Sequence, residues 1–201
     1  MIGYPNGRSA ASGSSKCTDA SGSAANRGMS LEKDLNDSNA YYLKCGRALI
    51  HKKPTPIQVV KVDYPARSAA RITEAYYKVP STTDYNGIYR GRPVDFEAKE
   101  TINKTSFPFK SIHPHQIEHL RLVILHGGIG FFIIRFRAYG ETYLIDASEI
   151  IEQYQSSKRK SISYAEVKRI GSLIHEGLTP RLRYLDNVDA IYFKEDTHHE
   201  K

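Results

Sequence analysis

The sequence has few cysteines and no long apolar segment. Cys17 and Cys45 are its two cysteines among 201 residues; they match no paired metal-ligand spacing and are too few for a disulfide framework. No run approaches the roughly 18 apolar residues of a membrane helix, and residues 1–16 lack the apolar stretch of a secretory signal. These absences argue against a disulfide-stabilised or membrane-spanning protein and predict a cytoplasmic one.

The chain carries an excess of positive charge. Its formal net charge is +7 and its isoelectric point is about 9.3, a balance that favours polyanionic partners, nucleic acid before an anionic membrane surface. Residues 44–78 hold eight Lys or Arg against two acids, so the excess is concentrated in one region. No long basic amphipathic helix is present, and we therefore predict no membrane partner.

Length and composition predict one globular domain with flexible ends. The Ser/Ala/Gly-rich stretch 8–25 cannot bury enough apolar surface to become ordered. We therefore assign residues 1–29 to a largely disordered arm, residues 30–194 to a single domain and residues 195–201 to a flexible tail.

Hydrophobic periodicity predicts an α/β protein. Leu31, Leu35 and Tyr42 recur at helical spacing behind a possible N-cap, Ser30. The almost wholly apolar run 129–136 predicts a strand that is covered on both faces. The other predicted elements are strands at 48–53, at 141–147 and at 190–193, two strands within 81–101 that turn near 90–92, and helices at 113–128, 148–155 and 164–170. Their order indicates helices packed around a mixed β-sheet.

Residues 54–80 form an unusual connection between two predicted strands. They contain Pro54, Pro56, Pro65 and Pro80, an extended β-branched run, and an Ala-rich segment from about 67 that predicts a short helix. Little of this resembles the core of a sheet. We predict a projecting excursion that is long enough to have a function, with a mobile surface loop as the alternative.

The stretch 81–101, STTDYNGIYRGRPVDFEAKET, carries the strongest chemical signal. Successive side chains of a strand point to opposite faces, so Asp95, Glu97 and Lys99 are expected to share one face. Asp84 lies thirteen residues before Glu97, a spacing that lets a hairpin bring the two carboxylates together.

This arrangement suits the hydrolysis of a phosphodiester. Carboxylate oxygens are hard ligands that Mg²⁺ prefers, a bound metal can activate water, and Lys99 can stabilise the negative charge that develops. An acid-x-Lys pair alone is also common on exposed strands. The alternative is therefore a hairpin whose charges are simply solvated.

Asp-x12-Glu-Ala-Lys resembles the PD-(D/E)xK nuclease motif, with Thr83 in place of the proline. Together with the segments MIGYPNG, NRGMSLEKDLN, HKKPTPIQVVKVDYP, SFPFKSIHPHQIEHL and LIDAS, it resembles the RecU-type Holliday junction resolvases. The resemblance runs from Met1 to about Phe193. It implies a restriction-endonuclease-like fold with a projecting stalk between two strands.

The resemblance also implies roles for particular residues. Metal ligands are implied at Thr82, Asp84, Glu97 and Gln116, and Lys99 is implied as the stabiliser of the transition state. Thr82 would share a face with Asp84 if both lay on a regular strand. Gln116 is expected in the first turn of the following helix, near the end of the motif strand.

Two further acids each allow two roles. Related junction resolvases carry an active-site acid in their first helix, which makes Glu32 a catalytic candidate; the alternative is an ordinary glutamate in the first turn of a helix. The family pattern assigns no metal to Asp95, which is then either a residue supporting the ligands or a solvated acid.

The excursion 54–80 resembles the family's stalk, which projects between the protomers of a dimer and contacts the centre of the junction. DNA contacts are then implied at Lys61, Arg67 and Arg71, with Arg27 beside the N-terminal arm as a further candidate. Such contacts read the DNA backbone and its branched shape more than base edges.

The sequence thus predicts a homodimeric nuclease that uses Mg²⁺, with Mn²⁺ as a possible substitute, to cut four-way junction DNA. The strand-exchange recombinase is a further partner that the resemblance allows. The alternatives are a general PD-(D/E)xK nuclease that cuts linear duplex, and a non-catalytic module that binds branched DNA or modulates the recombinase. His113, His115 and His119 lack the fuller ligand set that a zinc site needs.

Overall fold

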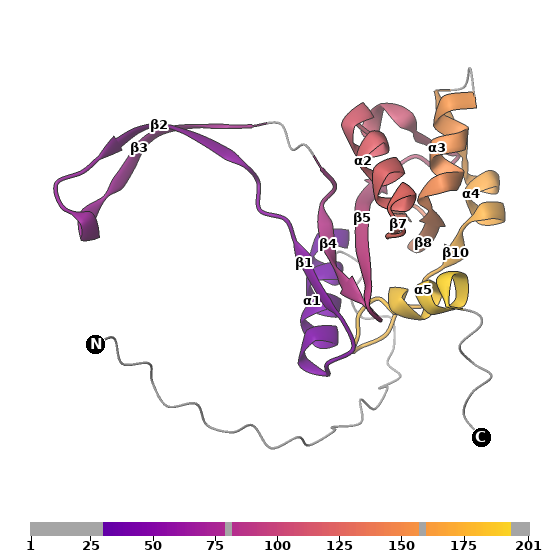
Figure 1. Cartoon of the computed structure of the whole chain (residues 1–201). Helices are drawn as coiled ribbons and strands as arrows, with labels where there is room; N and C mark the ends of the chain where they lie inside the picture. The colour runs from indigo at the N-terminus through magenta and orange to yellow at the C-terminus, as the bar shows by residue number, and fades with distance from the viewer. Residues whose placement is uncertain (1–29, 79–81, 157–159, 194–201) are drawn as a thin grey trace.

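A six-stranded mixed sheet forms the centre of the molecule (Figure 1). The structure, a computed structural model, describes residues 30–78, 82–156 and 160–193. The sheet consists, in spatial order, of β1 (Leu49–Lys52), β4 (Tyr85–Tyr89), β5 (Arg92–Thr101), β7 (Ile129–Phe136), β8 (Glu141–Asp146) and β10 (Ser172–Leu173). Strands β5 and β7 run parallel and the other neighbours antiparallel, which confirms the mixed sheet.

Helices cover both faces of this sheet. They are α1 (Leu31–Lys44), α2 (Pro114–Leu125), α3 (Ala147–Ser156), α4 (Tyr164–Ile170) and α5 (Tyr184–Tyr192). Helices α1 and α5 pack on one face and share a core with Phe96 and Phe131. Helices α2, α3 and α4 pack on the other, around Phe132 and Ile134. The predicted α/β fold with helices around a mixed sheet is therefore confirmed.

Strand β7 shows why the sheet is covered twice. All eight of its residues are buried. Phe131 and Ile133 belong to one core, whereas Phe132, Ile134 and Phe136 belong to the other. An apolar run without alternation has no face that is suited to water, so it requires a helical layer on each side.

Helix α1 begins where its capping residue predicts. The hydroxyl of Ser30 accepts a hydrogen bond from the Lys33 N–H at 3.3 Å, and the predicted apolar stripe Leu31, Leu35 and Tyr42 is buried. With 14 residues it is the longest helix described. Within the described ranges, no helix combines the length and apolarity that crossing a membrane requires.

Helix α2 is the crossover between the two parallel strands. Pro114 occupies its first turn, as predicted, because a missing N–H has no consequence there. The chain leaves the helix through Gly127, whose φ of 82° is readily adopted by glycine. This crossover sets the N-terminal half of α2 beside the face of β5 that carries Asp95, since His119 and Asp95 come within 3.2 Å.

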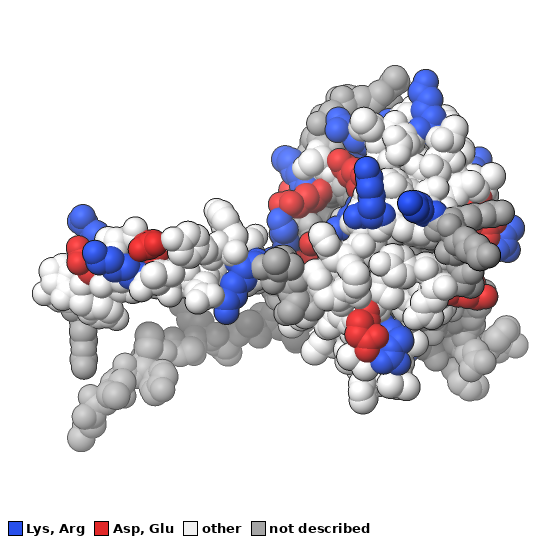
Figure 2. Space-filling model, turned by 90° about the horizontal axis from the view of Figure 1, so that it is seen from above, with Lys and Arg blue, Asp and Glu red and all other residues white. Residues whose placement is uncertain are grey.

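Strands β2 (Ile57–Asp63) and β3 (Arg71–Tyr77) form a separate antiparallel hairpin between β1 and β4. It extends away from the body of the molecule (Figure 1), and every position in both strands is exposed. Seen from above, Lys/Arg and Asp/Glu side chains lie side by side along it (Figure 2). We call residues 54–78 the stalk.

Three local predictions differ from the structure. Residues Ala190–Phe193 were predicted as a strand, but they complete and cap α5; Leu185, Val188 and Tyr192 follow a helical spacing that the short apolar run obscures. The helix predicted from Arg67 is limited to a 3-10 turn, η1 (Arg67–Ala69), and β3 follows. A small sheet of β6 (Ser106–Pro108) and β9 (Ser161–Ser163), with a 3-10 turn η2 (Phe109–Ser111), was not predicted.

Candidate active site

Strand β5 presents two chemically different faces. Val94 and Phe96 enter the core beneath α1 and α5, while Asp95 and Glu97 alternate with them and point toward the opposite layer. Both acids are nevertheless buried, with 8% and 0% of their surface exposed. A solvated strand face is therefore the wrong description of these charges.

The antiparallel pairing of β4 and β5 brings Asp84 beside Glu97. Tyr85 is opposite Phe96 in the register, so Asp84, the residue before Tyr85, lies beside Glu97, the residue after Phe96. The Asp84 N–H donates to Glu97 Oε2 at 3.1 Å, and Asp84 Oδ2 accepts from the Ala98 N–H at 3.4 Å. The hairpin proximity predicted from the thirteen-residue spacing is therefore present.

Glu97 has an unusual electrostatic environment. Its burial, reinforced by the negative charge of Asp84, raises the pKa of Glu97 from 4.5 to about 7, although Lys99 acts in the opposite direction. Lys99 Nζ lies 2.5 Å from Glu97 Oε1. The predicted acid and lysine are thus direct neighbours.

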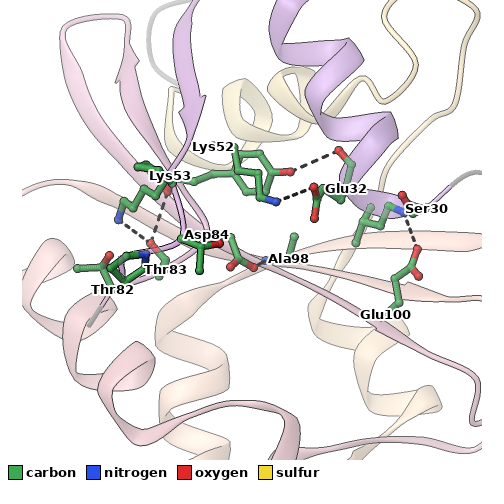
Figure 3. Close-up of a pocket in the computed structure, with 14 residues that line it drawn as sticks. Ser30, Glu32, Lys52, Lys53, Thr82, Thr83, Asp84, Ala98 and Glu100 are labelled. Carbon is green, nitrogen blue, oxygen red and sulfur yellow. Dashed lines mark hydrogen bonds and ion pairs between the residues drawn. The ribbon is translucent and has the colours of Figure 1, made fainter. Parts of the chain in front are cut away.

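A pocket of about 580 Å³ opens on the side of β5 toward α1. Figure 3 shows Asp84 between Thr82 on one side and Glu32, from α1, on the other. Glu32 Oε1 lies 2.6 Å from Lys52 Nζ, so Lys52 stands at the pocket between this acid and the stalk. Glu32 therefore shares this pocket with Thr82 and Asp84, whereas Glu97, Lys99 and Gln116 do not line it.

Thr82 reaches this pocket without lying on a strand. Strand β4 begins at Tyr85, so the expectation of a regular strand over 82–84 is wrong. Thr82 and Asp84 lie in the bend that precedes β4 and both line the pocket. The backbone of this bend is held by β1, since the Lys53 N–H donates to the Asp84 carbonyl at 2.8 Å.

Gln116 lies in the first turn of α2 and is buried. Its Oε1 accepts a hydrogen bond from the His113 N–H at 2.9 Å, which closes a capping box. The hydrogen bonds of the described residues link Gln116 to this cap and not to Asp84 or Glu97. One lone pair of the Gln116 amide oxygen is thus already engaged within the first turn of α2.

The predicted DNA contacts lie on the stalk, away from Asp84 and Glu97. Lys61 and Arg71 are exposed on β2 and β3, and Arg67 is in the 3-10 turn between these strands. Lys61 is paired with Glu74 in the register, and Arg71 with Asp63. Arg27 lies outside the described residues.

Sequence reasoning missed a cluster around Asp95. Lys53 Nζ approaches both carboxylate oxygens, at 3.2 and 3.0 Å, and also Thr83 Oγ1 at 3.0 Å. Thr83 itself hydrogen-bonds to Asp95, and His119 Nε2 lies 3.2 Å away. A signal was present in the strand alternation that put Asp95 on the face of Glu97, but nothing in the sequence indicated its three partners.

The residues present fit a divalent metal ion. Apart from its ion pair with Lys99, the buried Glu97 Oε1 has no hydrogen-bond partner in the described part of the chain. The neighbouring carboxylate of Asp84 raises the pKa of Glu97 by repulsion. A bound cation would give Glu97 Oε1 a partner and would relieve the repulsion between the two carboxylates. No group of three or more His, Cys, Asp or Glu suited to a metal occurs in residues 30–78, 82–156 and 160–193. The predicted set has only two carboxylates, completed by a hydroxyl and an amide.

A mixed sheet in which the bend before β4 sets Asp84 beside Glu97 on β5, with Lys99 next to Glu97, is the arrangement of the PD-(D/E)xK nuclease class. A family model described as Recombination protein U, RecU, matches residues 26–190. The chain belongs to the RecU family.

Curated relatives resemble this chain over nearly its full length. A protein of Shouchella clausii (strain KSM-K16) named Holliday junction resolvase RecU is 53% identical and covers 97% of each chain. One of Bacillus mycoides (strain KBAB4), with the same name, is 53% identical over 96% of this chain and 98% of its own. A solved structure of Archaeoglobus fulgidus Hjc, a Holliday junction resolvase, aligns with a TM-score of 0.41 and 10% identity, covering 70% of this chain and 93% of that one.

Proposed function

We propose that this protein is a divalent-metal-dependent endonuclease that resolves four-way DNA junctions by paired symmetric nicks, in recombination and DNA repair in the cytoplasm. The observation that carries the proposal is the hairpin contact of Asp84 with Glu97, beside Lys99, in a chain whose relatives are named Holliday junction resolvases. Membership of the family gives the substrate class, and these side chains give the chemistry.

Four side chains would hold the metal: Thr82, Asp84, Glu97 and Gln116. Their oxygens are hard ligands of the kind that suits Mg²⁺, with Mn²⁺ as a substitute. When bound, the cation supplies the Lewis acidity that activates a water and offsets charge on the phosphate. Gln116 would contribute the lone pair of Oε1 that its helix cap leaves free.

Lys99 and Glu32 have separate tasks in this proposal. Lys99 donates to the phosphate oxygen on which negative charge develops, as a fixed ammonium close to the acids. Glu32, which reaches the shared pocket from α1 and is paired with Lys52, orients the attacking water. Both groups act from rigid elements, a strand and a helix, so little reorganisation accompanies the reaction.

Affinity for the junction comes from the stalk. Lys61, Arg67 and Arg71 contact phosphates near the branch point, with Arg27 as an additional contact. A junction has near two-fold symmetry, and a C2 homodimer supplies two identical centres at a fixed separation for two matched nicks. The strand-exchange recombinase is a further partner in this proposal.

Cleavage of a synthetic four-way junction tests the proposal. Wild-type protein is incubated with a labelled junction and with linear duplex of the same sequence, in Mg²⁺, in Mn²⁺ and in chelator. We expect symmetric paired nicks in the junction alone, and only with metal. Equal cutting of duplex would indicate a general nuclease, and tight junction binding without cutting under any condition would indicate a non-catalytic module.

A further inference from the structure

Asp95 is a buried acid at which three separate segments of the chain meet. Lys53 lies between the end of β1 and the start of the stalk, and Thr83 lies between the stalk and the start of β4. His119 belongs to α2. Asp95 itself is on β5, two residues before Glu97, and touches one polar atom from each of the three.

The contacts engage the whole carboxylate. Lys53 Nζ lies 3.0 Å from Oδ2 and 3.2 Å from Oδ1. The Thr83 hydroxyl donates to Oδ1, and His119 Nε2 lies 3.2 Å from the same atom. A buried carboxylate with a charged partner and a hydroxyl donor is stabilised where it is. Both of its oxygens are therefore engaged by the protein.

These contacts join the residues that the proposed function uses. Thr83 is flanked by Thr82 and Asp84, and Lys53 also holds the Asp84 carbonyl through its backbone N–H at 2.8 Å. His119 follows Gln116 by three residues on the same helix. One carboxylate thus joins the bend 82–84 to the strand that carries Glu97 through hydrogen bonds, and helix α2 approaches the same carboxylate through His119 Nε2.

We propose that Asp95 is a positioning residue that fixes the base of the stalk and helix α2, one turn after Gln116, against β5, and so sets the spacing of the metal ligands. This inference rests on the proposed function, in which Thr82, Asp84, Glu97 and Gln116 hold one cation. Removing such an outer partner of the ligands weakens metal binding by about 10- to 100-fold in other proteins.

Asp95→Asn is the informative variant because it keeps the size of the side chain and one oxygen. It removes the negative charge opposite Lys53. The amide also has one acceptor oxygen instead of two, so Lys53 and Thr83 compete for that oxygen or one of them faces the N–H₂ group, which cannot accept a hydrogen bond. Glu118→Gln is the matched control: Glu118 is the residue before His119, is exposed, and pairs with Arg121 at 2.7 Å within its own helix. It changes the same charge without touching the cluster.

The first readout is Mn²⁺ affinity, measured by calorimetric titration without DNA. We expect Asp95→Asn to weaken Mn²⁺ binding by about 10-fold or more, and Glu118→Gln to leave it within about 2-fold. Thr83→Ser, which keeps the hydroxyl, should bind like wild type, whereas Thr83→Val should weaken binding in the same direction as Asp95→Asn.

The second readout is amide hydrogen exchange of the metal-free protein. Asp95→Asn should speed exchange of peptides covering 82–86 and 113–119 and leave β8 unchanged, which separates local positioning from general destabilisation. Unchanged Mn²⁺ affinity in a folded Asp95→Asn protein would overturn the inference. So would uniform acceleration of exchange over all segments.

Glu97→Gln in the same titration separates the test of the proposed metal site from the test of the positioning role of Asp95. If wild type binds Mn²⁺ and Glu97→Gln does not, the metal site stands, and only the behaviour of Asp95→Asn decides the positioning role. If wild type binds no Mn²⁺, both the proposed metal site and the role of Asp95 are overturned.

Discussion

Asp84 and Glu97 are joined by a hydrogen bond from the backbone N–H of the first to Oε2 of the second, at 3.1 Å. The bond places one buried carboxylate directly beside another acid, although thirteen residues separate them. The register of a single hairpin produces this contact, since Tyr85 pairs with Phe96. The resulting repulsion and burial together make Glu97 the most perturbed acid of the site.

The raised pKa of Glu97 predicts a pH-dependent stability of the metal-free protein. An acid whose pKa rises from 4.5 to about 7 on folding binds its proton more tightly in the folded state. Its contribution is fully present below pH 4.5 and is lost as the pH rises through about 7. The loss for one such group is on the order of 3 kcal/mol.

Urea unfolding in chelator at pH 5 and pH 8 measures this loss. We expect wild type to lose more stability than Glu97→Gln between these values, because glutamine does not titrate. The difference between the two proteins isolates the contribution of Glu97 from those of all groups that the two proteins share. Equal losses in both proteins would contradict the environment described for Glu97.

Replacing Lys99 tests the role of its ammonium group in cleavage. Lys99→Met removes the ammonium that lies 2.5 Å from Glu97 Oε1. We expect junction cleavage to fall by about 10²- to 10³-fold, as for loss of one preorganised donor, while junction affinity changes little. Lys168→Met, on α4 beside Tyr164, is the control. Equal activity of Lys99→Met and this control would remove Lys99 from the reaction.

Much of the fold follows from local sequence signals. The cap at Ser30, the apolar stripe of α1 and the unbroken apolar run of β7 each predict the observed element, because each depends on residues close in the chain. The prediction of a strand at 190–193 was wrong because a short apolar run fits a strand or a helix equally well. Its helical partners, Leu185 and Val188, decide the matter through packing on the sheet.

The candidate site was predictable to the extent that it is a hairpin. Asp84, Glu97 and Lys99 follow from strand alternation and loop spacing, both local properties. The partners of Asp95 do not, because Lys53, Thr83 and His119 reach it from three other segments. Burial of an acid depends on which helix crosses the strand, and no residue pattern in a single sequence reports that.

Charge removal on the stalk should lower junction affinity and its salt dependence together. Lys61→Ala with Arg71→Ala is expected to reduce the slope of log affinity against log salt by roughly 1 for each phosphate that the variant no longer neutralises. Glu74→Gln on the same hairpin removes a negative charge and should not weaken binding. Electrophoretic shift assays at several salt concentrations give both numbers. An unchanged slope in the double variant would contradict the assignment of the stalk to DNA.

A buried ion cluster beneath α1 predicts a large structural effect. Asp34 is 1% exposed and lies 2.7 Å from Arg135 Nη1 and 3.4 Å from Arg181 Nε. Asp34→Ala leaves the buried Arg135 and the partly buried Arg181 without this partner and should cost about 3–5 kcal/mol of unfolding free energy.

A surface pair on the same helix provides the control for Asp34. Asp37 is half exposed and pairs with Lys33 at 2.7 Å, so Asp37→Ala should cost about 1 kcal/mol or less. Urea denaturation at neutral pH measures both variants. Similar losses for the two would show that the buried cluster contributes no more than a surface pair.

The most direct test of the account separates binding from cutting at the acids themselves. Asp84→Asn and Glu97→Gln are assayed beside wild type for junction binding in chelator and for junction cleavage in Mg²⁺. We predict affinities within about 3-fold of wild type and cleavage reduced by about 10³-fold or more, since the carboxylates hold the metal and the stalk holds the DNA. Retained cleavage in both variants, or loss of binding together with cleavage, would contradict the claim that these two acids form the metal centre.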